Sequence, residues 1–189
     1  GHDGIYRGGV GRHLPGVHSA EVKEDHDSRA AHFAGGRVEV TVPASESFTV
    51  QFWMWNGVIN NSITLNNLVA EWNRAHLSLA NAKNDRDPVL TLVPGRGSLK
   101  TVEPRTWHLV TLVVRPHRCE LWLNGERVLD EPSARHYKSE FETRRFVFGG
   151  SAEGEIDFHG KLDEIAYFDR ALSAQEISSF LQKVKKSEK

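Results

Sequence analysis

Two carboxylates and an imidazole alternate in the segment Glu155-Ile156-Asp157-Phe158-His159. Residues two apart in a strand point to the same face, so Glu155, Asp157 and His159 would line one surface. Two carboxyl groups can cleave a glycosidic bond, one as nucleophile and one as general acid, when they lie about 5–5.5 Å apart. Close-set carboxylates also form solvated or ion-binding faces, and we expect that role here.

A second acidic pair, Asp163-Glu164, lies inside a strand-like run. Strict alternation cannot place Leu162, Ile165 and Tyr167 on one face, so the sequence predicts a β-bulge near Asp163. We expect the bulged pair to hydrogen-bond the backbone of a loop. The alternative is a calcium site, which needs six to eight converging oxygen ligands. Its ligands would be two carboxylates and carbonyls of the N-terminal segment: Asp157, Asp163 and the backbone around Asp25 and Asp27.

Several tryptophans are candidates for sugar binding. Aromatic rings stack on the apolar C–H faces of sugars, while amide, carboxylate or guanidinium groups bind the hydroxyls. Trp55 and Trp122 are the best candidates, whereas Trp53 is expected in the core. Further residues in the next strand-turn-strand region are expected to line the same surface: Trp72, Asn73, Arg74 and His76. The alternative for each tryptophan, and the more common role, is packing between a sheet and a covering loop.

Other side chains give little support for metal or nucleophilic catalysis. The ten histidines include no pair at the spacing of a helical zinc motif, so we expect scattered surface histidines. No G-x-S-x-G motif supports a Ser-His-Asp triad. The single cysteine, Cys119, excludes an intramolecular disulfide, and it shares a predicted strand face with Leu121 and Leu123. This pattern indicates a core thiol.

Short strands separated by turns make up most of the chain. Residues 48–55 alternate with bulky side chains on both faces, so both faces should be covered. Further strands are predicted at Arg37–Val42, Asn67–Glu71, Ala75–Ala80, Val89–Val93, Trp107–Val114, Cys119–Leu123, Arg145–Phe148 and Lys161–Phe168. With a single terminal helix, this order favours an antiparallel two-sheet sandwich over parallel βαβ units.

Two short sequence motifs predict a hairpin turn and the start of a helix. Asn124-Gly125 stands between two alternating runs and predicts a tight hairpin, because both central residues of a type I′ turn need positive φ. Ser173 and Glu176 have the spacing of a capping box, so a helix should begin near Ser173. The next apolar residues recur on one helical face: Ile177, Phe180, Leu181 and Val184.

The length of the chain indicates a single domain. We expect residues 1–30 to form an irregular N-terminal segment that supplies one edge strand, and residues 31–189 to form the body of the domain.

The 24 basic and 25 acidic residues form no basic stripe with interleaved aromatics, so neither nucleic acid nor an anionic membrane is an implied partner. No apolar run approaches the roughly 20 residues of a membrane span. Since the chain starts at Gly1 without a signal-like segment, we expect a piece of a longer protein with other domains.

Five motifs, in order, resemble those of the laminin-G-like, concanavalin A-like jelly-roll domains of bacterial extracellular proteins. The resemblance covers about residues 31–181 and rests on Phe33–Val40, Phe48–Trp53, Trp107-His108, Leu121–Gly125 and Gly160–Ile177. The last of these matches the closing signature of the family almost residue for residue. The resemblance implies an all-β, two-sheet antiparallel jelly-roll sandwich with one short C-terminal helix.

The resemblance also implies a function: a non-catalytic module that binds a carbohydrate or a partner protein. Such a module would be an accessory domain of a larger bacterial protein that is extracellular, periplasmic or in the cell envelope. Some relatives hold calcium near the sheet edge. One alternative is a glycoside hydrolase-like enzyme centred on Glu155 and Asp157, although the further glutamate of laminarinase-like hydrolases is missing here. Another is a structural scaffold between domains without a small ligand.

Overall fold

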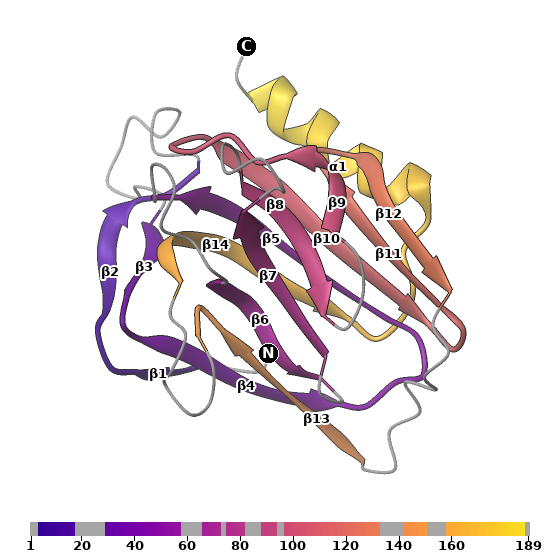
Figure 1. The fold of residues 1–189 in the computed structure, drawn as a ribbon, viewed down its shortest axis with the longest axis horizontal. Coiled ribbons are helices and arrows are strands. Elements are labelled where there is room, and N and C mark those ends of the chain that lie inside the picture. Colours follow the sequence, from indigo (N-terminus) through magenta and orange to yellow (C-terminus); the bar gives the residue numbers. More distant parts are fainter. Residues whose placement is uncertain are drawn as a thin grey trace.

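The computed structural model describes residues 4–17, 29–57, 66–72, 75–81, 88–93, 97–132, 142–150 and 158–187. Within these residues, two seven-stranded antiparallel sheets pack face to face (Figure 1). Sheet A contains, from edge to edge, β1 (Ile5–Arg7), β4 (Arg37–Pro43), β13 (Thr143–Phe148), β6 (Asn66–Trp72), β7 (Ala75–Asn81), β8 (Pro88–Val93) and β9 (Gly97–Thr101). Sheet B contains β12 (Glu126–Pro132), β11 (Arg118–Leu123), β10 (Trp107–Arg115), β5 (Phe48–Asn56), β14 (His159–Phe168), β3 (Arg29–Ala34) and β2 (Val10–Pro15).

A helix, α1 (Ala174–Ser187), follows β14. The predicted jelly-roll sandwich with a C-terminal helix is therefore confirmed. At one side of the sandwich the edge strands β9 and β12 lie beside each other, and Lys100 of β9 forms an ion pair with Glu126 of β12.

The N-terminal segment is more regular than its sequence predicts. It supplies two edge strands, since β1 pairs with β4 in sheet A and β2 pairs with β3 in sheet B. Strand β3 starts at Arg29, so the expected boundary after residue 30 falls inside a strand. Both edge strands pair through their backbones while most of their side chains stay exposed. An apolar alternation, the signal used to find strands in the sequence, is therefore absent there.

The core between the sheets is built around β5. One face of β5 places four side chains against sheet A, all fully buried: Phe48, Val50, Phe52 and Met54. Aromatic side chains of β13 meet them edge to face, with ring centroids 5.7 Å apart for Phe48 and Phe146. Cys119 lies in the same core, which confirms the predicted core thiol.

The other face of β5 is tied to the segment before α1. The Thr49 hydroxyl donates a hydrogen bond to the carbonyl of Arg170 and accepts one from the N–H of Leu172, both at 2.9 Å. Leu172 and Ile177 are buried against Val113 of β10 on this outer face of sheet B. The apolar face of α1 therefore covers the outer face of sheet B near the start of β5.

Hydrogen bonds at the start of α1 confirm the capping box. The Glu176 carboxylate accepts from the Ser173 N–H at 2.8 Å, and the Ser173 hydroxyl accepts from the Glu176 N–H at 3.3 Å. The Arg170 guanidinium donates to the same carboxylate at 2.5 Å. The bonds from Arg170 and then from Ser173 lower the pKa of Glu176 to about 2.

The Asn124-Gly125 turn has φ values of 50° and 77°, as the type I′ prediction requires. The Asn124 side chain fastens this turn to β10: its Oδ1 accepts from the Leu109 N–H at 2.9 Å, and its Nδ2 donates to Nδ1 of His108 at 3.1 Å. His108 is buried, unlike the expected surface histidines, and its Nε2 donates to the carbonyl of Glu103 at 3.0 Å. Burial lowers the pKa of His108.

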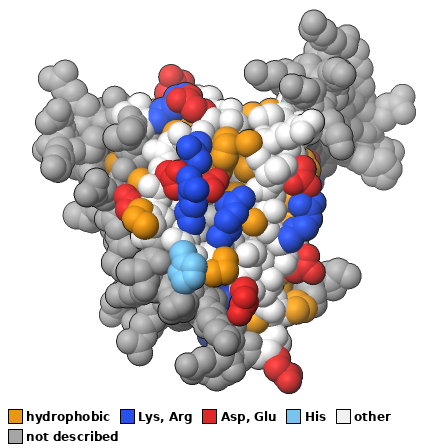
Figure 2. Space-filling model, turned by 90° about the vertical axis from the view of Figure 1, so that its right-hand side faces the viewer, with side chains coloured by type: hydrophobic (Ala, Val, Ile, Leu, Met, Phe, Trp, Pro, Cys, Tyr) orange, Lys and Arg blue, Asp and Glu red, His pale blue; other side chains and the backbone are white. Residues whose placement is uncertain are grey.

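Charged side chains of β10, β11 and β12 lie near one edge of sheet B. Arg118 pairs with Asp130, Arg127 lies 3.2 Å from Asp130, and Arg115 lies 2.8 Å from Glu120. Figure 2, which views the molecule from this side, shows basic and acidic side chains next to each other. Charges along an exposed edge disfavour pairing with the edge strand of another chain.

The capping box predicts the effect of Ser173→Ala. Loss of the N-cap hydroxyl should lower the free energy of unfolding by about 1 kcal/mol, measured by urea denaturation. Ser179→Ala, within the same helix, is the control, because it leaves the first turn unchanged and alanine favours helix. If the free energy of unfolding falls equally in both variants, the Ser173 cap does not stabilise the helix.

Buried His108 predicts a pH dependence of stability. Because its folded-state pKa lies below the ordinary value of 6.5, the unfolded state binds more protons at acidic pH. This contribution to stability is therefore present above about pH 6.5 and is lost as the pH falls below it. Urea midpoints between about pH 7 and pH 5 should fall more in the native protein than in His108→Gln. If the urea midpoints of the two proteins change equally with pH, His108 does not bind a proton when the protein unfolds.

Candidate functional site

The structure divides the predicted binding residues between the two sheets. Trp55 and Trp122 belong to sheet B, whereas the backbones of Trp72 and His76 belong to β6 and β7 of sheet A. The two groups therefore belong to different sheets, and the expectation that they line one surface stays a prediction. Four other predicted residues lie outside the described part of the chain: Asn73, Arg74, Glu155 and Asp157.

Trp122 packs beneath α1. It contacts the buried cluster of Val113, Leu172 and Ile177, and its indole N–H donates to Glu120 at 3.2 Å. The guanidinium carbon of Arg127 lies 6.0 Å from the centroid of its ring. These contacts favour the packing alternative for Trp122.

The strand register also separates Trp122 from Trp55. Trp122 lies opposite Thr111 of β10, which lies opposite Gln51 of β5. Gln51 and Trp55 are four residues apart, which is about 13 Å along a strand at roughly 3.3 Å per residue. The two tryptophans therefore do not form one compact site.

Trp55 instead belongs to a row of four side chains across the outer face of sheet B. Cross-strand pairing places Trp107 of β10 beside Trp55, Lys161 of β14 on its other side, and His32 of β3 beyond Lys161. We call these four residues the Trp55 row. Each is partly buried and partly exposed.

The chemistry of the Trp55 row suits polyhydroxylated ligands. Its two indoles come from directly opposed positions, where side chains of an antiparallel pair are about 4.5–5.5 Å apart at Cβ. The Lys161 ammonium lies 5.0 Å from the Trp55 ring centroid and donates to the carbonyl of Pro15 at 3.3 Å. The row thus combines apolar ring faces with an ammonium donor and an imidazole that can donate or accept.

Sequence reasoning missed three members of this row. Trp107 was recognised only as the start of a strand, while Lys161 and His32 carried no motif. Alternation within each strand could place each side chain on a face. The register between strands, which brings the four together, has no signal in the local sequence.

The predicted bulge in β14 is present. The register against β5 shifts between Asp163 and Ala166, and Glu164 has a φ of 48°. The Asp163 carboxylate accepts from the N–H of Val17 at 3.0 Å and from the N–H of Glu164 at 2.9 Å. Val17 follows β2, so Asp163 holds the backbone of the N-terminal segment, as expected for the hydrogen-bonding role.

The calcium alternative has no complete ligand set within the described residues. They contain no group of three His, Cys, Asp or Glu residues that could hold a metal ion. Asp163 alone does not provide the six to eight oxygens that calcium takes. The other ligands proposed from the sequence, the Asp157 carboxylate and the backbone carbonyls around Asp25 and Asp27, lie outside the residues that the structure describes.

In the described part of the chain, no helix has the length and apolar character needed to cross a membrane.

Several solved structures have a similar fold. Domain 4 of an extracellular arabinanase from Geobacillus stearothermophilus, in complex with arabinotriose, matches with a TM-score of 0.66 and 15% identity, over 95% of this chain and 88% of that one. A heptameric pentraxin from Limulus polyphemus matches with a TM-score of 0.60 and 16% identity, over 77% and 75%. The binding domain of a paraclostridial mosquitocidal protein matches with a TM-score of 0.63 and 14% identity, over 97% and 48%. At these identities the likeness shows the fold alone.

Comparison by sequence gives the family. No curated protein matches the chain. The family model described as the concanavalin A-like lectin/glucanases superfamily matches residues 27–178, which is most of the chain. The protein therefore belongs to the concanavalin A-like lectin/glucanase superfamily.

Proposed function

We propose that this domain is a non-catalytic recognition module that binds a carbohydrate on the Trp55 row. The observation that carries the proposal is the cross-strand juxtaposition of Trp55 and Trp107, both partly exposed on the outer face of sheet B. Two neighbouring ring faces can stack on the apolar faces of a sugar, while Lys161 and His32 in the same row bind its hydroxyls.

The comparisons support a carbohydrate ligand. The superfamily includes lectins, and the arabinanase domain of similar fold is in complex with arabinotriose. That arabinanase is extracellular, and we propose that the present domain likewise acts in a secreted or cell-envelope protein, as one part of a longer chain. A partner protein in place of a glycan is the alternative ligand.

The non-catalytic part of the proposal rests on sequence. The acidic segment around Glu155 and Asp157 lacks the further glutamate of laminarinase-like hydrolases. An enzyme that retains configuration needs two carboxyl groups about 5–5.5 Å apart in an open groove. We therefore expect binding without release of products when soluble β-glucans are incubated with the protein.

Trp55→Ala tests the glycan site. On a glycan array, the native protein should bind selected sugars, and the variant should bind them about three- to tenfold more weakly, because one stacking interaction is lost. Trp122→Phe is the matched control, since Trp122 packs beneath α1, and it should keep glycan binding. The melting temperature of each variant is measured in parallel.

Three results would contradict this assignment. If Trp55→Ala does not fold, the Trp55 ring belongs to the core and is not a binding residue. An equal loss of binding in Trp122→Phe would place the site elsewhere. If the native protein binds no glycan on the array, a protein ligand or a structural scaffold role would be favoured.

Calcium binding is a separate proposal, which rests on Asp157 and on the resemblance to calcium-binding relatives. An ion that binds the folded state stabilises it by mass action, so the melting temperature is the suitable measurement.

Asp163→Asn distinguishes a fold role from a metal role at this position. The asparagine amide keeps only one acceptor oxygen, so one of the two hydrogen bonds donated by the N–H groups of Val17 and Glu164 is lost. The melting temperature should therefore fall equally in chelator and in millimolar calcium. A chelator-reversible rise with calcium in the native protein, abolished by Asp163→Asn, would instead assign Asp163 to a calcium site.

A further inference from the structure

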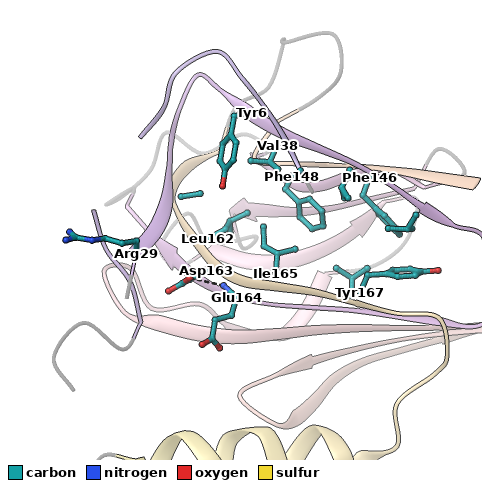
Figure 3. Close-up of a pocket in the computed structure, with 15 residues that line it drawn as sticks. Tyr6, Arg29, Val38, Phe146, Phe148, Leu162, Asp163, Glu164, Ile165 and Tyr167 are labelled. Carbon is teal, nitrogen blue, oxygen red and sulfur yellow. Dashed lines mark hydrogen bonds between the residues drawn. The ribbon is translucent and has the colours of Figure 1, made fainter. Parts of the chain in front are cut away.

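A large cavity lies between the two sheets, near the edge strand β1, to which the labelled residue Tyr6 belongs (Figure 3). Its volume is about 510 Å³, within the range of about 300–1,000 Å³ that is typical of ligand pockets. Strands β4 and β13 of sheet A form one wall, and β3, β5 and β14 of sheet B form the other. The cavity thus lies inside the sandwich, on the opposite face of sheet B from the Trp55 row.

Most of the side chains that line this cavity are apolar. The cavity is lined from sheet A by valines and phenylalanines and from sheet B by aliphatic side chains, among them Val40, Val42, Phe146, Phe148, Leu162 and Ile165. The cavity is open to solvent at the edge of the sandwich, since Tyr6 keeps 46% and Ile165 keeps 37% of its surface exposed. An apolar occupant would cover the exposed apolar surface of Ile165.

The bulge in β14 helps to shape this cavity. It places Ile165 between Leu162 and Tyr167 on the inner side of the strand, where strict alternation would not put all three. At one end of the cavity, the Tyr167 hydroxyl donates to the carbonyl of Pro43 at 2.9 Å and so joins the two sheets. Burial raises the pKa of Tyr167, which keeps this donor protonated at neutral pH.

Polar groups at the cavity restrict the charge of a ligand. Figure 3 shows Arg29 and Glu164 pointing away from the cavity, and Asp163 accepts backbone N–H bonds from Val17 and Glu164. The Tyr6 ring, 46% exposed, projects from β1 toward the cavity and brings a phenolic hydroxyl to it (Figure 3). Burying an unpaired ion among apolar walls is costly, so an uncharged ligand is favoured.

We propose that this cavity binds an uncharged, largely apolar small molecule whose single hydroxyl or carbonyl group meets the Tyr6 hydroxyl. This site is independent of the Trp55 row, since the two lie on opposite faces of sheet B. The domain would then hold two ligands of different chemistry, a glycan outside and an apolar molecule between its sheets.

A neutral fluorescent probe, phenylnaphthylamine, tests the cavity in the full chain. Its fluorescence should rise to saturation with one probe per chain, and the melting temperature should rise with it. Val40→Phe fills the cavity from β4 and should weaken probe binding at least about tenfold, with the melting temperature unchanged or higher. Thr41→Phe is the matched control, because it adds the same ring at the next, exposed position, and it should keep probe binding.

Tyr6→Phe tests the polar contact without changing the shape of the cavity. The native protein should bind naphthol about five- to tenfold more tightly than naphthalene, the expected effect of one hydrogen bond, and this preference should disappear in Tyr6→Phe. Since Tyr6 is half-exposed at an edge strand, the substitution should leave the fold intact.

Four results would overturn the proposal. They are the absence of saturable probe binding, unchanged binding in Val40→Phe, equal loss in Thr41→Phe, and loss of probe binding in Trp55→Ala. The last result would show that the probe binds the Trp55 row. Because Trp55→Ala should weaken glycan binding and keep probe binding, failure of this proposal is distinguishable from failure of the glycan proposal.

Discussion

The structure depends on one constraint, which is that both faces of the central strand β5 must be covered. Its inner residues, such as Phe52, form the middle of the core between the sheets. Its outer face begins at Thr49, whose hydroxyl holds the segment that leads into α1, and continues to Trp53, which is buried. The helix is therefore part of the sandwich, because it removes from water an apolar surface that sheet A cannot reach. At the far end of the strand, Trp55 is only partly covered, and there the outer face becomes available to a ligand.

The closing signature of the family can be explained by these contacts. Gly160 is required because a Cβ there would collide with the carbonyl oxygen of Trp55. Asp163 fixes the bulge and the N-terminal segment, while Arg170, Ser173 and Glu176 form the hydrogen-bonded start of α1. These residues thus fix the path of β14 and the start of α1. The signature therefore specifies the fold, and it says little about the ligand.

The same strands present different chemistry on their two faces. Lys161 of β14 points outward into the Trp55 row, whereas Leu162, the next residue, faces the cavity between the sheets. Strand alternation makes such a separation unavoidable, since successive side chains point to opposite sides. The Trp55 row and the cavity can therefore be built from adjacent residues of the same strands, although no side chain belongs to both.

The sequence by itself determined most of the strands, the Asn124-Gly125 hairpin, the cap at Ser173 and the bulge at Asp163. These features depend on residues only a few positions apart, whose backbone preferences and hydrogen bonds act over short range. Only the tertiary structure decided that Trp107 lies beside Trp55, that the edge strands come from the N-terminal segment, and that a cavity remains between the sheets. Those outcomes depend on strand register and sheet order, which are set by the summed packing of residues far apart in the chain.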